Sequence, residues 1–117
     1  MDPFEDREKA FEAKYHMDEE VAFKTNARRD KLLGLWVAGH LGLSGAAAET
    51  YAKSVVGSDL ADARHKAMIE KLVADLHNAK AKVGASELCA EMERLNEVAR
   101  QQILQELAAG KQSVSPS

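Results

Sequence analysis

The sequence predicts an all-α protein in which three or four helices pack as an antiparallel bundle behind an N-terminal arm. Hydrophobic residues make up 45% of the 117 residues but aromatic residues only 5%, a balance typical of helical rather than sheet domains. Glycines and polar cap residues separate segments whose apolar residues recur every three or four positions, and no segment alternates like a strand. A chain of this length predicts one compact core.

The N-terminal segment predicts a helix that is poorly suited to a core. It can begin at Pro3, which favours the first helical position. Its apolar residues are sparse and form one narrow stripe of Phe4, Phe11 and Tyr15. This stripe suits an amphipathic helix laid into a partner's groove, and the alternative is a helix extension packed on its own bundle.

The rest of the chain predicts the bundle. Residues 32–38 are apolar nearly all round, which indicates a central helix buried by neighbours on several sides. Cap residues and glycines then mark the expected boundaries of three further helices at Ser44 to Gly57, Asp59 to Gly84, and Ser86 to Gly110. The expected organisation is an arm over 1–18, a helical bundle over 19–110 and a disordered tail over 111–117.

Charge and cysteine content argue against several classes of partner and predict a cellular location. The net charge is −3 with both signs interspersed, so a nucleic-acid partner and a polybasic membrane patch are not expected. The longest apolar patch, residues 32–43, is too short and too interrupted to insert into a membrane. A single cysteine, Cys89, and a charged N-terminus predict a reducing, cytoplasmic location.

Patterns that would carry catalysis are missing from the sequence. No nucleophile with a base, carboxylate pair, metal-ligand spacing or glycine-rich phosphate loop is found, so we expect neither an enzyme nor a required cofactor or metal. His16 has Glu12 and Glu20 four residues to either side, which favours a solvated charge pair over a metal site or pH switch.

A line of cations is the second candidate site. Lys24, Arg28 and Lys31 are spaced four and three apart, so a helix places them on one face. Such a face can hold phosphates, with Trp36 or Tyr51 as the ring that stacks on a base. The alternative is a solvated helix face.

Several motifs resemble one family. Residues 6–15 read Asp-Arg-Glu-Lys-Ala-Phe-Glu-Ala-Lys-Tyr, and they are followed by Asp18-Glu19-Glu20, Phe23-Lys24, Ala27-Arg28-Arg29 and Lys31-Leu32-Leu33-Gly34-Leu35-Trp36. Together they resemble the zeta-type inhibitor subunit of alphaproteobacterial F-type ATP synthases. The resemblance continues residue by residue through Val55-Val56, and beyond Gly57 only in helical pattern.

The resemblance implies a four-helix bundle with a mobile N-terminal arm that enters the catalytic head of the ATP synthase, made of its alpha, beta and gamma subunits. There the arm blocks rotation in the hydrolysing direction as a one-way ratchet. On this chain the inhibitory segment is about Asp2 to His16, and the partner-contacting residues are Phe4, Asp6, Arg7, Glu8, Lys9, Ala10, Phe11, Lys14 and Tyr15. The three aromatic residues are the expected anchors, and the basic ones set register against acidic surfaces.

The resemblance also implies weak binding of ATP or ADP on the bundle, for which Lys24, Arg28, Lys31 and Trp36 are the candidates. It places the protein in the cytoplasm, at the inner-membrane-bound ATP synthase. Membership of a fold does not guarantee inhibition, so a bundle that senses a purine-type metabolite and acts on another target is the alternative.

Overall fold

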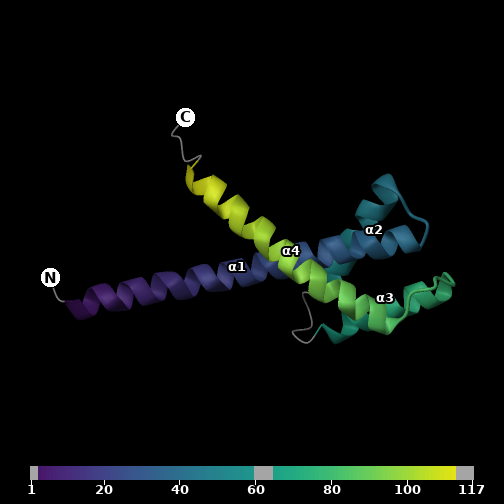
Figure 1. Cartoon of the computed structure of the whole chain (residues 1–117), viewed down its shortest axis with the longest axis horizontal. Coiled ribbons are helices and arrows are strands. Elements are labelled where there is room, and N and C mark those ends of the chain that lie inside the picture. Colours follow the sequence, from purple (N-terminus) through teal and green to yellow (C-terminus); the bar gives the residue numbers. More distant parts are fainter. Residues whose placement is uncertain (1–2, 60–64, 113–117) are drawn as a thin grey trace.

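The computed structural model describes residues 3–59 and 65–112, with side chains over 18–59 and 65–110 (Figure 1). The described residues form helices and no strands, so the predicted all-α class is confirmed. The helices are α1 (Pro3–His40), α2 (Gly45–Asp59), α3 (Lys66–Asn78) and α4 (Ala85–Gln112).

Helix α1 is the spine of the fold. Its C-terminal half packs mainly against α2 and α4, while α3 contacts all the other helices. α4 runs in the opposite direction to α1 and crosses it, so that the N-terminal half of α1 and the last turns of α4 project from the same side of the bundle and diverge (Figure 1). α1 continues without a break across the expected boundary between residues 18 and 19. Arm, bundle and tail as separate units, and the mobility of the arm, remain predictions.

All four helices contribute to one hydrophobic core. Its fully buried side chains recur at helical spacing, as the apolar stripes of the sequence predict, because each helix turns one face inward. They are Leu33 and Val37 in α1, Val55 in α2, Met68, Leu72 and Leu76 in α3, and Leu88 in α4. Trp36 is only half-buried against this core, with its ring edge on His40 at a centroid distance of 4.6 Å.

Two glycines do not end helices where the sequence predicts. α2 continues through Gly57 to Asp59, and α4 continues through Gly110 to Gln112. Both glycines are exposed and helical, and a solvent-facing glycine inside a helix costs only about 1 kcal/mol relative to alanine. A cost this small does not end either helix.

The expected end of α3 at Gly84 is also wrong. The helix ends at Asn78 because Lys80 adopts a left-handed conformation with φ of 57°. The Lys80 amide donates to the His77 carbonyl and the Ala81 amide to the Leu76 carbonyl, each at 3.0 Å, which closes the helix as glycine does in a Schellman motif. Lysine does not favour a left-handed backbone, so the residue at position 80 does not signal the end of the helix.

The cap of α4 is made by different residues from those expected. The helix begins at Ala85, so Ser86 lies inside its first turn. The Gly84 amide donates to the Glu87 carboxylate at 3.0 Å, and the Gly84 carbonyl accepts from the Leu88 amide at 3.0 Å. This is the acid half of a capping box, with glycine at the N-cap.

Gly34 sets the approach of α1 to α2. A Cβ at this position would lie 2.8 Å from Cα of Ala52, which is backbone and cannot rotate away. Gly34→Ala should therefore lower the free energy of unfolding by about 1 to 3 kcal/mol, although alanine is the better helix former. Gly39→Ala in the same helix is the control: nothing lies within 4 Å, so a gain of about 0.5 kcal/mol is expected. Urea unfolding measures both, and equal effects would contradict the close packing of α1 on α2.

Candidate functional site

The three predicted cations line one hollow of about 490 Å³. Lys24, Arg28 and Lys31 lie along its α1 wall, as their spacing predicts. The other lining residues come from three helices and are Phe23, Ala27, Val56, Ile103 and Glu106. An apolar floor with a cationic edge suits a ligand that has both a ring or aliphatic part and a negative charge.

Two of the three cations already form ion pairs within the protein. Nη1 and Nη2 of Arg28 donate to the two carboxylate oxygens of Glu106 at 2.7 and 2.8 Å, and Nη1 also donates to Gln102 at 2.8 Å. The hydrogen bond from Arg28 lowers the pKa of the Glu106 carboxyl. Lys24 pairs with Glu20 at 2.8 Å, whereas Lys31 has no ion-pair partner among the described residues. Lys31 is therefore the cation most available to a ligand.

Phe23, not Trp36, is the aromatic residue of this hollow. Trp36 lies about 140° around α1 from Lys31, because each residue turns a helix by about 100°. Tyr51 is also engaged elsewhere, donating its hydroxyl to Asp75 at 2.6 Å. The Phe23 side chain is 63% exposed, a large exposure for an aromatic residue. Its signal in the sequence is the spacing of four residues to Ala27, which lines the same hollow.

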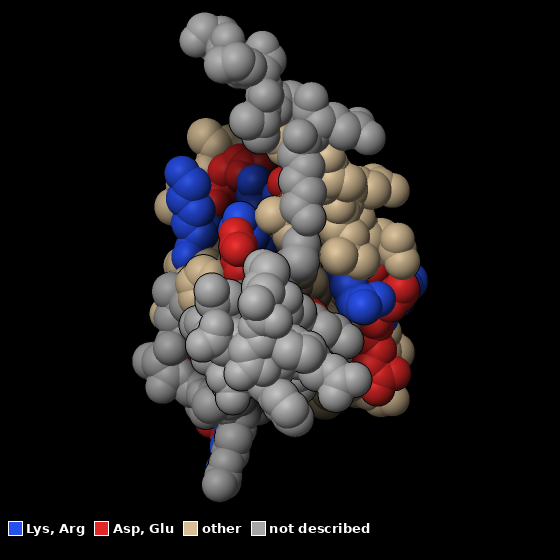
Figure 2. All heavy atoms as spheres, turned by 90° about the vertical axis from the view of Figure 1, so that its left-hand side faces the viewer, with Lys and Arg blue, Asp and Glu red and all other residues tan. Residues whose placement is uncertain are grey.

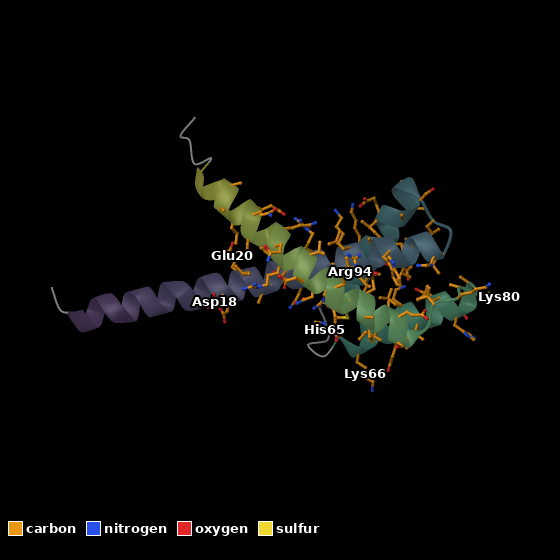
Figure 3. All side chains as sticks on the ribbon, viewed as in Figure 1. Asp18, Glu20, His65, Lys66, Lys80 and Arg94 are labelled. Carbon is orange, nitrogen blue, oxygen red and sulfur yellow. The ribbon has the colours of Figure 1, made fainter. Side chains whose placement is uncertain are left out.

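The surface around the projecting helices is mixed in charge. Figure 2 views the molecule from the side on which the N-terminal half of α1 projects, and basic and acidic side chains lie next to each other there. Asp18 and Glu20 lie on the projecting part of α1, outside the bundle (Figure 3). This pattern agrees with the interspersed charges of the sequence.

A buried polar cluster lies where all the helices meet, and no sequence pattern predicts it. Arg29 donates through Nε and Nη2 to Asp30 at 3.1 Å, and Nη2 also lies 3.5 Å from Asp59 at the end of α2. Nδ1 of His65, in the connection to α3, is 2.7 Å from an Asp59 oxygen (Figure 3). Asn96 of α4 accepts from Arg29 at 3.3 Å. The members are far apart in sequence, so only the fold brings them together.

The predicted arm contacts fall on residues whose side chains lie outside the described part, as does His16. The backbone of these positions belongs to α1, and the contacts of their side chains stay predictions.

Within the described residues, no group of three or more His, Cys, Asp or Glu side chains is arranged to hold a metal. None of the helices there is long and apolar enough to cross a membrane. The described fold is a small helical bundle whose first helix projects beyond it and whose surface carries one hollow edged by cations.

The chain belongs to the family described as ATPase inhibitor subunit zeta, which matches residues 1–102. The resemblance seen in the sequence is thereby confirmed. No curated protein matches the chain. A protein solved by solution NMR is similar, with 42% identity and a TM-score of 0.64 over 72% of this chain and 95% of the other. Family membership supports a regulatory role as an ATPase inhibitor that interacts with the ATP synthase.

Proposed function

We propose that the chain inhibits ATP hydrolysis by the F-type ATP synthase by inserting the N-terminal part of α1 into the catalytic head as a one-way ratchet. The observation that carries this proposal is the shape of α1. It is one helix of 38 residues, about 57 Å long at about 1.5 Å per residue. Among the described side chains of α1, Thr25 is the first that is buried, and residues 18–24 before it are exposed or only partly buried.

A continuous helix couples the arm to the bundle. An arm that enters a groove between subunits would be held by the bundle attached to it. Sharp kinks in helices occur at prolines, bulges or similar breaks, and α1 is uninterrupted with no proline after Pro3. The Glu20–Lys24 ion pair, four residues apart on the exposed face, supports the helix where it leaves the bundle. Phe4, Phe11 and Tyr15 then supply the anchors.

The direct test is steady-state turnover of the cognate synthase with and without added protein. We expect ATP hydrolysis to fall with increasing protein, while ATP synthesis under a proton gradient is spared, because the ratchet blocks one direction of rotation. Equal inhibition of both directions would contradict the ratchet. No effect on hydrolysis would contradict the inhibitor role itself.

We infer a second, weaker function in the hollow of α1, α2 and α4, namely binding of ATP, ADP or a related purine nucleotide. The specific observation in its favour is an exposed ring, Phe23, beside three cations. A base can stack on Phe23 while Lys31 and Lys24 bind phosphate oxygens. Arg28 could add a contact only by leaving Glu106, so the affinity depends on the two lysines and is low.

Nucleotide binding predicts a sharp difference between two lysine variants. Titration with ATP or ADP should shift amide signals around the hollow, and Lys31→Glu should weaken this binding at least about tenfold, since a charge contact of about 1.4 kcal/mol is tenfold in affinity. Lys53→Glu is the control, because Lys53 is exposed on α2 and does not line the hollow. Shifts that persist unchanged in Lys31→Glu would place any nucleotide elsewhere, without bearing on inhibition.

A further inference from the structure

The buried polar cluster joins α1, the end of α2, α4 and the residue that precedes α3. Arg29, Asp30 and Asp59 are 6%, 2% and 7% exposed. The first two belong to α1 and the third ends α2. Charged groups of this kind are almost never buried unless they are paired. Their pairing is therefore part of how α1 is fixed to the rest of the fold.

The charges of this cluster do not balance while the His65 ring is neutral. Arg29 then supplies one positive charge, whereas Asp30 and Asp59 would supply two negative charges within one buried network. Two carboxyl groups that share a buried site hold one proton between them, because a second negative charge there is unfavourable. Burial and a hydrogen bond to Asp59 raise the pKa of Asp30 to about 8, against the lowering effect of Arg29.

Asp59, one of the two carboxyl groups, also contacts the residue that precedes α3. Nδ1 of His65 lies 2.7 and 2.8 Å from the two oxygens of Asp59, and His65 holds a left-handed backbone with φ of 61° directly before α3 begins. A side-chain contact stabilises this uncommon conformation. Asp59 therefore holds the start of α3 on one side and Arg29 of α1 on the other.

The charged groups that face this pair come from each neighbouring element. Besides Arg29 on α1 and His65 before α3, α4 contributes Asn96, which is uncharged, and Glu93, which lines a hollow beside Arg29. Among the described residues Arg29 is thus the permanent cation that holds the Asp30–Asp59 pair, and His65 adds a second positive charge only when its ring is protonated.

We propose that Asp30 and Asp59 form a proton-dependent latch that fastens α1 to the junction of α2 and α3. With one proton shared, Asp30 donates to Asp59, and Arg29 balances the remaining charge. When the proton is lost, the two carboxylates repel each other, and the hold of Asp59 on Arg29 and His65 weakens. The latch belongs to the bundle itself and does not depend on the proposed inhibition.

The sign of the effect follows from linkage. An unfolded aspartate loses its proton near pH 4, whereas Asp30 in the folded protein keeps it up to about pH 8. Between these values the folded state binds the extra proton, so its stability is highest at the acid end and falls as pH rises. The unfolding equilibrium constant should increase by up to about tenfold per pH unit, and level off above about pH 8.

The test uses the full chain, unfolded in urea at intervals from pH 6 to 9. Asp30→Asn keeps a hydrogen-bond donor toward Asp59 at every pH, so this variant should lose the pH dependence that the parent shows. Asp75→Asn is the control: Asp75 pairs with Lys71 and Tyr51, hydrogen bonds that lower the pKa of its carboxyl, so it stays ionised over this range. The control should keep the parent's profile. Equal profiles for the parent and Asp30→Asn would overturn the latch.

A second measurement uses the parent protein alone, so it tests the proposal even if Asp30→Asn fails to fold. The carboxyl carbon signal of Asp30 in the parent protein should titrate near pH 8, and hydrogen-exchange protection at the end of α2 should fall across the same range, after correction for the intrinsic rate. A midpoint near pH 4, or protection that does not change through pH 9, would overturn the proposal.

Discussion

Arg29→Ala is expected to lower the free energy of unfolding by about 3 to 5 kcal/mol, because it leaves the Asp59 carboxylate buried without its cation. Arg28→Ala, one position earlier, is the matched control. Arg28 pairs with Glu106 at the exposed edge of the hollow, and such pairs contribute about 0 to 1 kcal/mol. Urea unfolding at one pH measures both variants.

The comparison separates burial from charge, since both variants remove one arginine from adjacent positions of the same helix. Similar losses for the two would mean that Arg29 does not hold a buried charge network. A small loss for Arg29→Ala alone would also contradict the cation–carboxylate balance on which the latch depends.

The second large effect is expected in the arm. Phe11→Asp should reduce inhibition of the cognate ATPase by about a hundredfold or more, because burying an unpaired carboxylate costs several kcal/mol and each 1.4 kcal/mol is tenfold. Ala10→Pro should do the same for another reason, since proline inside α1 costs about 3 kcal/mol of helix stability. Inhibition curves measure both, with thermal unfolding of the free protein expected to stay unchanged.

The two variants test separate parts of the arm proposal. If both inhibit as well as the parent chain, the N-terminal part of α1 is not the inhibitory element. If only Ala10→Pro stays active, Phe11 still contacts the partner but the arm binds in an extended form, and helical spacing no longer identifies Phe4 and Tyr15 as its fellow anchors.

Local patterns of the sequence predict much of the fold. Apolar spacing is enough to identify the buried faces of α3 and α4, including Leu72, Leu76 and Leu88, because helical periodicity is a local property. The spacing of Lys24, Arg28 and Lys31 likewise predicts their shared face, whereas the hollow that they line is known only from the structure.

Features that depend on distant contacts could not be predicted in this way. Asp59 reads as a helix cap in the sequence, but it ends α2 as a buried partner of Arg29 from another helix. Lys80 takes a left-handed conformation that favours glycine, so the end of α3 has no compositional signal. The continuity of α1 through residue 18 depends on weak local preferences, which sequence patterns do not resolve.

The most direct test of the proposed inhibition is ATP hydrolysis by the cognate synthase in the presence of the full chain or of a chain lacking residues 1–16. We expect the full chain to inhibit and the shortened chain to leave hydrolysis unchanged, while circular dichroism shows a cooperative unfolding transition for both. Inhibition by the shortened chain at the same concentrations would contradict the account, because the bundle and not the arm would then be the inhibitory element.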